Sequence, residues 1–441
     1  MLRNFTFWEF PQPLPAPRYW YWLLVVLSLF FAGGQLGLRD EIKPLLVVLI
    51  VAGSYVLLRY HPEFRRSPWP YFVLAAALIP LLSWILVSFQ EPEVASSSPR
   101  SEDLMNQFIF ILPALILAGS TRNTLTFWAV GILAALTLPW SSGAGLTEII
   151  AATEGKRSGF GRHIISMGIV HGAILLGALI FFSRLVLHPR FSWWRFLLWS
   201  LLVGYMVFAL LASQSRAVYL GILVALLVGF VWLVVYYFHY PQAWKKSWKV
   251  YVLIVLLLVA FLKIFQGTEL VEATWERTLK EIQVYHQVIA GDWEEVPRNS
   301  AGLRIHFWTD VLEWAAERPV FGWGYGAGQQ MHQQADNWFG DRYFITVHND
   351  FLEILITYGL VGVAFVLTFF AWMGRQIYQA WKAGVMATDF LAFFVLFFIF
   401  YLVNSVFLTT FLFRDTVYLF NIIMAGAAGF VFKLRWQQDG R

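Results

Sequence analysis

His348 directly precedes an apolar run of the chain, residues 349–373. Helical spacing places His348 on the same face of this run as Gly359 and Gly362, and glycines allow another helix to approach closely. The amide donors at the start of such a helix favour anions, and histidine titrates near neutral pH, so it can serve several roles there. A histidine can also do no more than satisfy a helix start, and the residues alone leave both interpretations open.

Arg304 lies in a segment, residues 302–317, whose apolar side chains form one arc of a predicted helix. At 3.6 residues per turn, Arg304 falls in the middle of that arc with Trp308 and Val311, and the acids of the segment fall on the far side. A buried guanidinium that faces away from acids suits a phosphate ligand, because its planar fork can bind two oxygens. The alternative is an arginine that reaches water from the membrane surface.

Arg216 lies in the short sequence Ala212-Ser-Gln-Ser-Arg-Ala217 between two apolar runs. A cation at a helix N-terminus is unfavourable unless an anion joins it. Ser213, Gln214 and Ser215 add neutral hydrogen-bonding groups. The segment therefore predicts either an anion site or a structural ion pair with an acid from the large loop, residues 266–347.

Other candidate groups carry weaker signals. The glycine-rich residues 321–328 follow a predicted helix rather than a strand, so they are not a dinucleotide fingerprint. Glu91-Pro-Glu93 is more typical of solvated charge than of a metal site, and His171 in mid-span either functions or bonds across helices. The chain has no cysteine and no His, Asp and Glu set with metal spacing. We expect neither a metal nor a cofactor.

The composition indicates the elements that must position these groups. Of the 441 residues, 59% are hydrophobic and 13% are charged, whereas a soluble chain carries about 25% charged residues. Apolar runs near the roughly 20 residues that a membrane helix needs recur along the chain. We predict an all-α polytopic membrane helix bundle of about twelve transmembrane helices, with no face for nucleic acid. The predicted spans lie near residues 19–34, 44–59, 69–89, 105–119, 123–140, 163–182, 194–212, 217–238, 248–265, 349–373, 385–411 and 416–433.

The basic residues set the predicted orientation. With both termini in the cytoplasm, the inside segments hold 17 of the 32 basic residues and four of the 27 acids. The same topology places residues 266–347 outside as one large loop with short helices, and loops of this length tend to be functional. The predicted division is residues 1–265 with nine spans, the loop 266–347, and residues 348–441 with three spans.

The residues around His348 resemble the O-antigen ligase and polymerase superfamily. The motif of that family is a histidine, then Asn, Ser or Gln, nine residues, a glycine, two residues, and Gly, Thr or Tyr. His348, Asn349, Gly359 and Gly362 fill its fixed positions. Supporting similarity lies in Ser215-Arg216-Ala217, in Arg304 and Trp308 followed by residues 318–326, and in Arg157-Ser-Gly-Phe-Gly161, which lacks the asparagine-proline that often follows.

The resemblance implies a metal-independent transfer of a glycan from undecaprenyl pyrophosphate to an acceptor, on the periplasmic side of the bacterial inner membrane. His348 would be the general base for the acceptor hydroxyl. Arg216 and Arg304 would hold the pyrophosphate and stabilise the charge that develops on it. Direct attack would invert the anomeric centre. The resemblance further implies substrate binding by Arg157, Asn349, Ser215 and Trp308, and a structural role in the motif for Gly359 and Gly362.

Within the superfamily, one large outer loop and a short segment after the last span favour a ligase, whose acceptor is the lipid A–core. Polymerases commonly carry two substantial outer loops, and protein-glycosylating members often add a long C-terminal domain. The alternatives are an O-antigen polymerase, a protein O-oligosaccharyltransferase and a transporter of lipid-linked glycans. A transporter would carry polar groups along a midplane pathway, whereas the candidate groups here gather at the outer edge.

Overall fold

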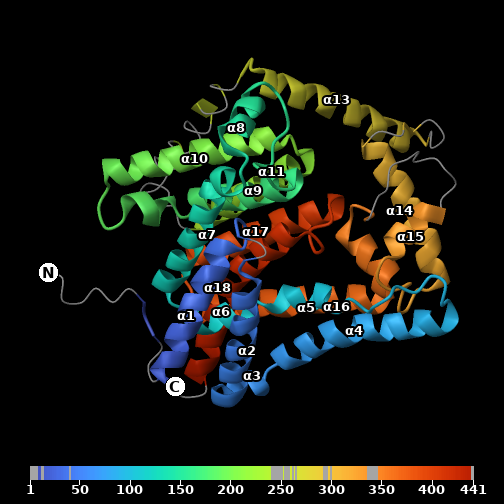
Figure 1. Cartoon of the computed structure of the whole chain (residues 1–441). Helices are drawn as coiled ribbons and strands as arrows, with labels where there is room; N and C mark the ends of the chain where they lie inside the picture. The colour runs from blue at the N-terminus through green and yellow to red at the C-terminus, as the bar shows by residue number, and fades with distance from the viewer. Residues whose placement is uncertain are drawn as a thin grey trace. The chain divides into compact units, whose positions relative to one another are not determined.

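The computed structural model describes residues 8–10, 14–38, 41–239, 266–291, 296–297, 300–334 and 346–438, with isolated positions at 252, 259–260 and 263. This part of the chain is helical and contains no strand (Figure 1). Eight of its helices are long and apolar enough to cross a membrane. The predicted all-α, multi-pass membrane class is confirmed. The count of twelve spans, the outer loop and the division at residues 265 and 347 remain predictions.

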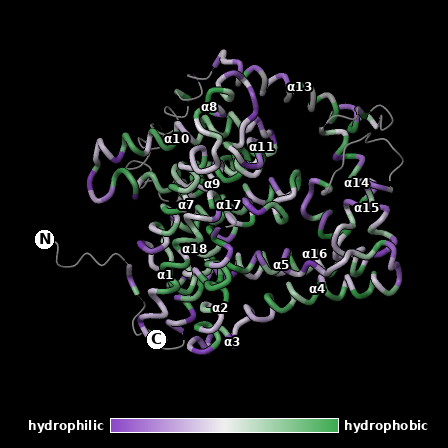
Figure 2. The backbone as a smooth tube through the Cα atoms, viewed as in Figure 1, coloured by the Kyte–Doolittle hydropathy of each residue, from purple (hydrophilic) through white to green (hydrophobic). Residues whose placement is uncertain are grey.

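The long apolar helices follow the predicted spans closely, and two shorter apolar helices, α1 (Arg18–Gly34) and α9 (Ile164–Ile180), fall on predicted spans as well. Hydrophobic residues follow most of the length of α4 and α18 (Figure 2). The eight long helices are α2 (Lys43–Tyr60), α4 (Trp69–Gln90), α7 (Thr121–Ser141), α10 (Trp193–Ser213), α11 (Arg216–His239), α16 (Asp350–Lys382), α17 (Thr388–Phe407) and α18 (Arg414–Gln438).

The remaining helices connect or cover the long ones. Nine-residue α8 and eight-residue α15 are short, whereas α13 and α14 reach 22 and 18 residues and have mixed polarity. The bounds are α3 (Pro62–Arg65), α5 (Glu102–Met105), the 3-10 helix η1 (Asn106–Phe108), α6 (Ile111–Leu117), α8 (Gly145–Thr153), the π-helix η2 (Ser183–Leu187), α13 (Glu269–Ala290), α14 (Ser300–Glu317) and α15 (Ala327–Gln334).

The prediction of one continuous span over residues 105–119 is wrong, because η1 and α6 follow each other there with a break between them. Asn421 of α18 satisfies the backbone at the break. Its Oδ1 accepts from the Phe110 amide at 2.6 Å, and its Nδ2 donates to the Asn106 carbonyl at 2.9 Å. Irregular backbone is tolerated at membrane depth where protein groups satisfy it. The predicted span 248–265 lies almost wholly outside the described residues.

The chain forms two compact units. Unit 1 comprises Met1–Ala134, Arg298–Ala387 and Ser405–Arg441, and α18 is its buried centre, packed against α6 and α16. Unit 2 comprises Ala135–Pro297 and Thr388–Asn404, and its α9 packs against α10 and α11. Within unit 2, Arg184 also binds the carboxylate of Asp389, with 2.9 Å between Nη2 and Oδ1.

Candidate functional site

His348 lies immediately before α16 in the left-handed region of backbone conformation, with φ of 56°. The next residue, Asn349, is the N-cap of α16, and its Oδ1 accepts from the amides of Phe351 and Leu352 at 3.0 and 3.1 Å. Asparagine is favoured at this position because its short side chain satisfies amides that the first turn leaves unpaired. The cap occupies the side-chain oxygen of Asn349, so a substrate contact would have to use its amide nitrogen.

Two side chains bind Val347, the residue that precedes His348. Trp308 Nε1 donates to the Val347 carbonyl at 3.1 Å, and the Val347 amide donates to Glu353 Oε2 at 2.9 Å. Val347 itself is fully buried, in one hydrophobic cluster with Val311 of α14. The backbone that carries His348 is therefore held from both α14 and α16.

The buried face of α14 is close to the predicted one. Phe307, Val311 and Ala315 are buried, and Arg304 lies half-buried on the same face as Val311 and Ala315. Leu312 departs from the prediction, since it is 55% exposed at the edge of the arc. The placement of Arg304 in the apolar arc rather than among the acids of the helix is thus a feature of the fold.

His332 of α15 packs against the ring of Phe307 in the same region, with ring centroids 4.0 Å apart. Its Nε2 lies 3.3 Å from the carbonyl oxygen of Thr346, two residues before His348. Burial lowers the pKa of His332 to about 4, although the hydrogen bond to Thr346 opposes this shift. At neutral pH the ring is therefore uncharged, and Nε2–H donates to the carbonyl.

The motif glycine Gly359 interrupts α16, with φ of 65° and ψ of −163° inside the helix. Only glycine adopts this conformation readily. The backbone of residues 319–324 pairs with both sides of the interruption. The amides of Trp323 and Gly324 donate to the carbonyls of Ile356 and Thr357 at 2.7 and 2.9 Å, and those of Leu360 and Val361 donate to the carbonyls of Pro319 and Val320 at 2.8 and 3.2 Å.

Close approach explains why this segment contains glycines. A Cβ atom on Gly359 would lie 2.6 Å from the Phe321 amide nitrogen, and one on Gly322 would lie 2.6 Å from the Ile356 carbonyl oxygen. Ser83 of α4 contacts both segments, since its hydroxyl lies 2.7 Å from the Phe321 carbonyl and 3.0 Å from that of Thr357. A non-helical segment, residues 319–324, therefore packs against Gly359. The expectation that another helix approaches is wrong at this position.

Asp350, the first residue of α16, anchors the segment that leads into α18. Its Oδ2 accepts from the Thr410 amide at 2.9 Å and from the Thr410 hydroxyl, and its Oδ1 accepts from the Phe411 amide at 3.0 Å. Asp350 is 1% exposed. From the sequence, Asp350 and Glu353 are acids that suit the helix dipole. In the structure, Asp350 binds the segment before α18 and Glu353 binds Val347.

Unit 2 brings the other candidate residues together. Arg157 Nε donates to the Ser213 carbonyl at 3.1 Å, and the Ser158 amide donates to the Ala212 carbonyl at 3.0 Å. Gln214 adopts left-handed backbone, which ends α10 and lets α11 begin at Arg216 two residues later. Ser215 is buried in this turn. Arg157 is therefore tied to the turn that carries Ser215 and Arg216.

The candidate residues form two groups, one in each unit. Arg304, Trp308, His348 and Asn349 belong to unit 1, whereas Arg157, Ser215 and Arg216 belong to unit 2. Sequence reasoning missed Glu353 and His332 as supports of the His348 segment. The sequence shows that Glu353 lies in the first turns of α16. It does not show the bond from Glu353 to Val347, because that bond depends on a turn that no sequence pattern predicts.

The described residues thus define a helical, multi-pass membrane protein with two groups of candidate residues. Residues 201–367 match the family model described as O-Antigen ligase. The match runs from α10 into α16 and includes Ser215, Arg216, Arg304 and the whole His348 motif, whereas Arg157 lies outside it. This part of the chain is therefore similar to the O-antigen ligase family, and the resemblance that the motifs indicated is confirmed. None of the curated proteins matches the chain.

Proposed function

We propose that the protein is an O-antigen ligase, which transfers a glycan from undecaprenyl pyrophosphate to the lipid A–core. The proposal includes the inner membrane as location, cytoplasmic termini and a site that faces the periplasm. The observation that carries it is the family match over residues 201–367, which contains a His348 motif braced by Trp308 and Glu353. Similarity to this family supports ligase-type or polymerase-type glycan transfer in general.

In the proposed reaction, His348 accepts the proton of an acceptor hydroxyl as that oxygen attacks the anomeric carbon of the glycan. The bond from the anomeric carbon to the pyrophosphate oxygen breaks, and its electron pair leaves with undecaprenyl pyrophosphate. Attack opposite the leaving group inverts the anomeric centre. The proposed reaction uses no metal and no cofactor.

The proposed role of Arg304 and Arg216 is to bind the pyrophosphate and to stabilise the negative charge that grows on it. Arginine suits this role because it stays charged and its planar fork binds two oxygens at once. Arg157, Ser215 and Trp308 are proposed as substrate-binding residues. The bond from Arg157 to the Ser213 carbonyl supports a shared role with Arg216, because it ties Arg157 to the turn that carries Arg216.

A reconstituted assay tests the proposal. Purified protein is mixed with an undecaprenyl-pyrophosphate glycan and rough lipopolysaccharide in EDTA, and the products are separated on a gel. A ladder of larger lipopolysaccharide is expected, with the rate reduced by about 100-fold or more in His348→Ala, the range that a lost general base produces. Arg304→Ala and Arg216→Ala should also lose transfer.

Matched controls separate a local effect from a general one. His286→Ala on α13 and Arg375→Ala on α16 remove exposed side chains of the same types outside the motif, and they should keep the full rate. Longer lipid-linked glycan with untouched acceptor would make the protein a polymerase. An active His348→Ala variant would remove the base assignment, and absence of transfer to any acceptor would favour a transporter.

A further inference from the structure

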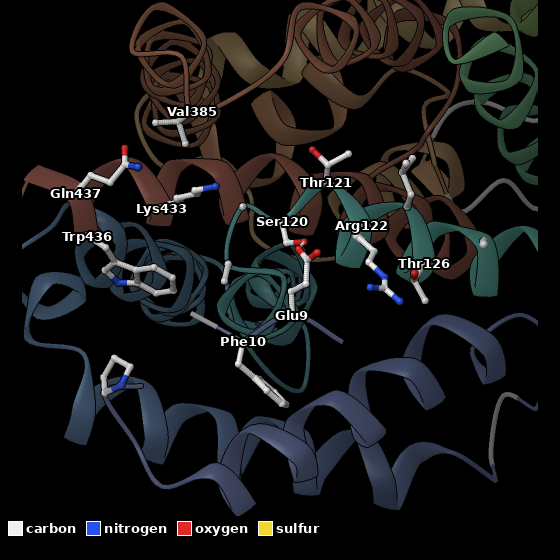
Figure 3. A pocket seen from close by; sticks show the side chains of 15 residues that line it. Glu9, Phe10, Ser120, Thr121, Arg122, Thr126, Val385, Lys433, Trp436 and Gln437 are labelled. Atoms are coloured by element: carbon white, nitrogen blue, oxygen red, sulfur yellow. Dashed lines mark hydrogen bonds between the residues drawn. The ribbon is translucent and has the colours of Figure 1, made fainter. Parts of the chain in front are cut away.

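A second feature of unit 1 is a pocket of about 890 Å³ between the N-terminal end of α7 and the C-terminal end of α18 (Figure 3). None of the residues of the His348 motif lines it.

Asp350 binds Thr410 and Phe411 just before α18 begins at Arg414, whereas Lys433 lines the pocket near the other end of that helix. Nineteen residues of helix rise roughly 29 Å, close to the thickness of a hydrocarbon core. The pocket and His348 thus lie at opposite ends of a membrane-length helix.

The polar part of the pocket carries two cations, Lys433 and Arg122, beside the start of α7. One acid, Glu9, also lines it, and its carboxylate accepts from the hydroxyl of Ser120. Figure 3 shows Lys433 and Arg122 on either side of the Glu9–Ser120 pair. Within the described part of the chain, Lys433 has no ion-pair partner. Two cations, one carboxylate and the amide end of a helix favour an added anion.

The backbone shapes the position of Lys433. Gly119 has φ of +64°, and a Cβ atom on it would lie 2.7 Å from Cβ and 2.8 Å from Cδ of Lys433. The aliphatic stem of Lys433 therefore crosses directly over Gly119, and any side chain at residue 119 would displace it. The lysine is held by close packing rather than left to extend freely into solvent.

One wall of the pocket continues as an apolar face. Arg122, Thr126 and Ala129 line the pocket and, at 3.6 residues per turn, lie on one face of α7. The same face continues to Leu133, which is 59% exposed. Small side chains at 126 and 129 leave room beside the helix. A charged end that opens onto an exposed apolar strip matches an amphiphile with an anionic head.

We propose that this pocket binds an anionic phospholipid of the leaflet opposite to His348, with its phosphate at Lys433 and Arg122 and one acyl chain along α7. Basic pockets between membrane helices bind anionic lipid headgroups in this way. A soluble phosphate compound would use the cations but would gain nothing from the strip that ends at Leu133. The site is independent of the proposed glycan transfer.

Native mass spectrometry of the delipidated full-length protein, titrated with phosphatidylglycerol or phosphatidylcholine, tests the proposal. Phosphatidylglycerol should bind more tightly. Lys433→Gln and Arg122→Gln should each weaken its binding roughly fivefold, the scale of one basic residue near an anionic lipid surface. Ala129→Leu should also weaken it by filling the chain path. Lys382→Gln, an exposed lysine outside the pocket, should bind as the unchanged protein does.

Two results would overturn the proposal. One is equal affinity for the two lipids, or an unchanged affinity for phosphatidylglycerol in both Lys433→Gln and Arg122→Gln. The other is displacement of phosphatidylglycerol by inorganic phosphate together with no effect of Ala129→Leu, which would assign the pocket to a soluble anion. Each variant is first checked for a melting transition. If one of the two cation variants does not fold, binding is measured with the other, so that a loss of folding is not mistaken for a loss of binding.

Discussion

Trp308 and Glu353 bind opposite sides of a single residue, Val347, over 3.1 Å and 2.9 Å. Trp308 comes from α14, and Glu353 comes from the first turns of α16. Their common partner directly precedes His348, so the position of the histidine depends on two elements at once. Such support would matter for the proton transfer that we propose for His348, because a displacement of about 1 Å can cost about 100-fold in rate.

Glu353→Ala should reduce glycan transfer by about tenfold or more without abolishing folding. The substitution removes the acceptor of the Val347 amide, and a buried unpaired amide costs about 1–3 kcal/mol. The chain before His348 is then free to relax. Glu353→Gln keeps a side-chain oxygen and should retain most of the rate in the reconstituted assay. Full activity of Glu353→Ala, with an unchanged melting temperature, would show that this bond does not position His348.

Gly359→Ala should destabilise the protein by about 3 kcal/mol or more, because it combines a backbone conformation reserved for glycine with a severe clash. The added Cβ would lie 2.6 Å from the Phe321 amide nitrogen. Gly374→Ala is the matched control within the same helix, since a Cβ there meets nothing within 4 Å. That substitution should be neutral or raise stability by up to about 1 kcal/mol. Thermal unfolding of both variants in detergent distinguishes the sites, and equal melting temperatures would contradict the described break.

Asp350→Ala should lower the free energy of unfolding by about 3 kcal/mol, because it leaves three buried donors of Thr410 and Phe411 without an acceptor. Asp350→Asn keeps one oxygen and should lose less. Denaturation followed by circular dichroism measures both. A stable Asp350→Asn variant that has lost transfer altogether would point instead to a direct part for Asp350 in the reaction.

Acid should weaken the region around α15. His332 has a pKa of about 4 in the folded protein, below the ordinary 6.5, so the unfolded chain binds a proton that the folded chain excludes between these values. The contribution of uncharged His332 to the free energy of unfolding is fully present above about pH 6.5. It falls as the pH drops to 4, by at most about 3 kcal/mol. Melting temperatures from neutral to acidic pH measure this loss.

His332→Gln keeps a donor for the Thr346 carbonyl and removes the titration, so its melting temperature should depend less on acid. His286→Gln on α13 removes an exposed histidine instead, and its pH dependence should match that of the unchanged protein. If both variants respond to acid alike, His332 does not control this loss.

Composition and periodicity predicted the membrane helices well, because an apolar run of span length has few other solutions. They failed over residues 105–119, where Asn421 of a distant helix supplies the hydrogen bonds that permit a break. The orientation, with both termini in the cytoplasm, stays a prediction.

The sequence likewise predicted some features of the candidate site and not others. Helical periodicity placed Arg304 on the buried face of α14, because the face follows from side-chain polarity alone. The motif marked Gly359, but the sequence could not show that residues 319–324 fill the interruption, since that pairing joins backbone groups without any side-chain signal. The link between Arg157 and the turn before Arg216 was equally hidden, because Arg157 binds a carbonyl oxygen that every residue possesses.

Because α16 is interrupted at Gly359, the spacing of the motif corresponds to a fixed length of helix. Residues 350–358 form a separate piece of helix between the cap at Asn349 and the break at Gly359, and nine residues rise about 14 Å. Both ends of this piece are pinned, one by a side chain and the other by a neighbouring backbone. An inserted residue would turn His348 by about 100° and shift it by about 1.5 Å. The nine residues between Asn349 and Gly359 therefore fix both the position of the histidine along the helix axis and its direction around that axis.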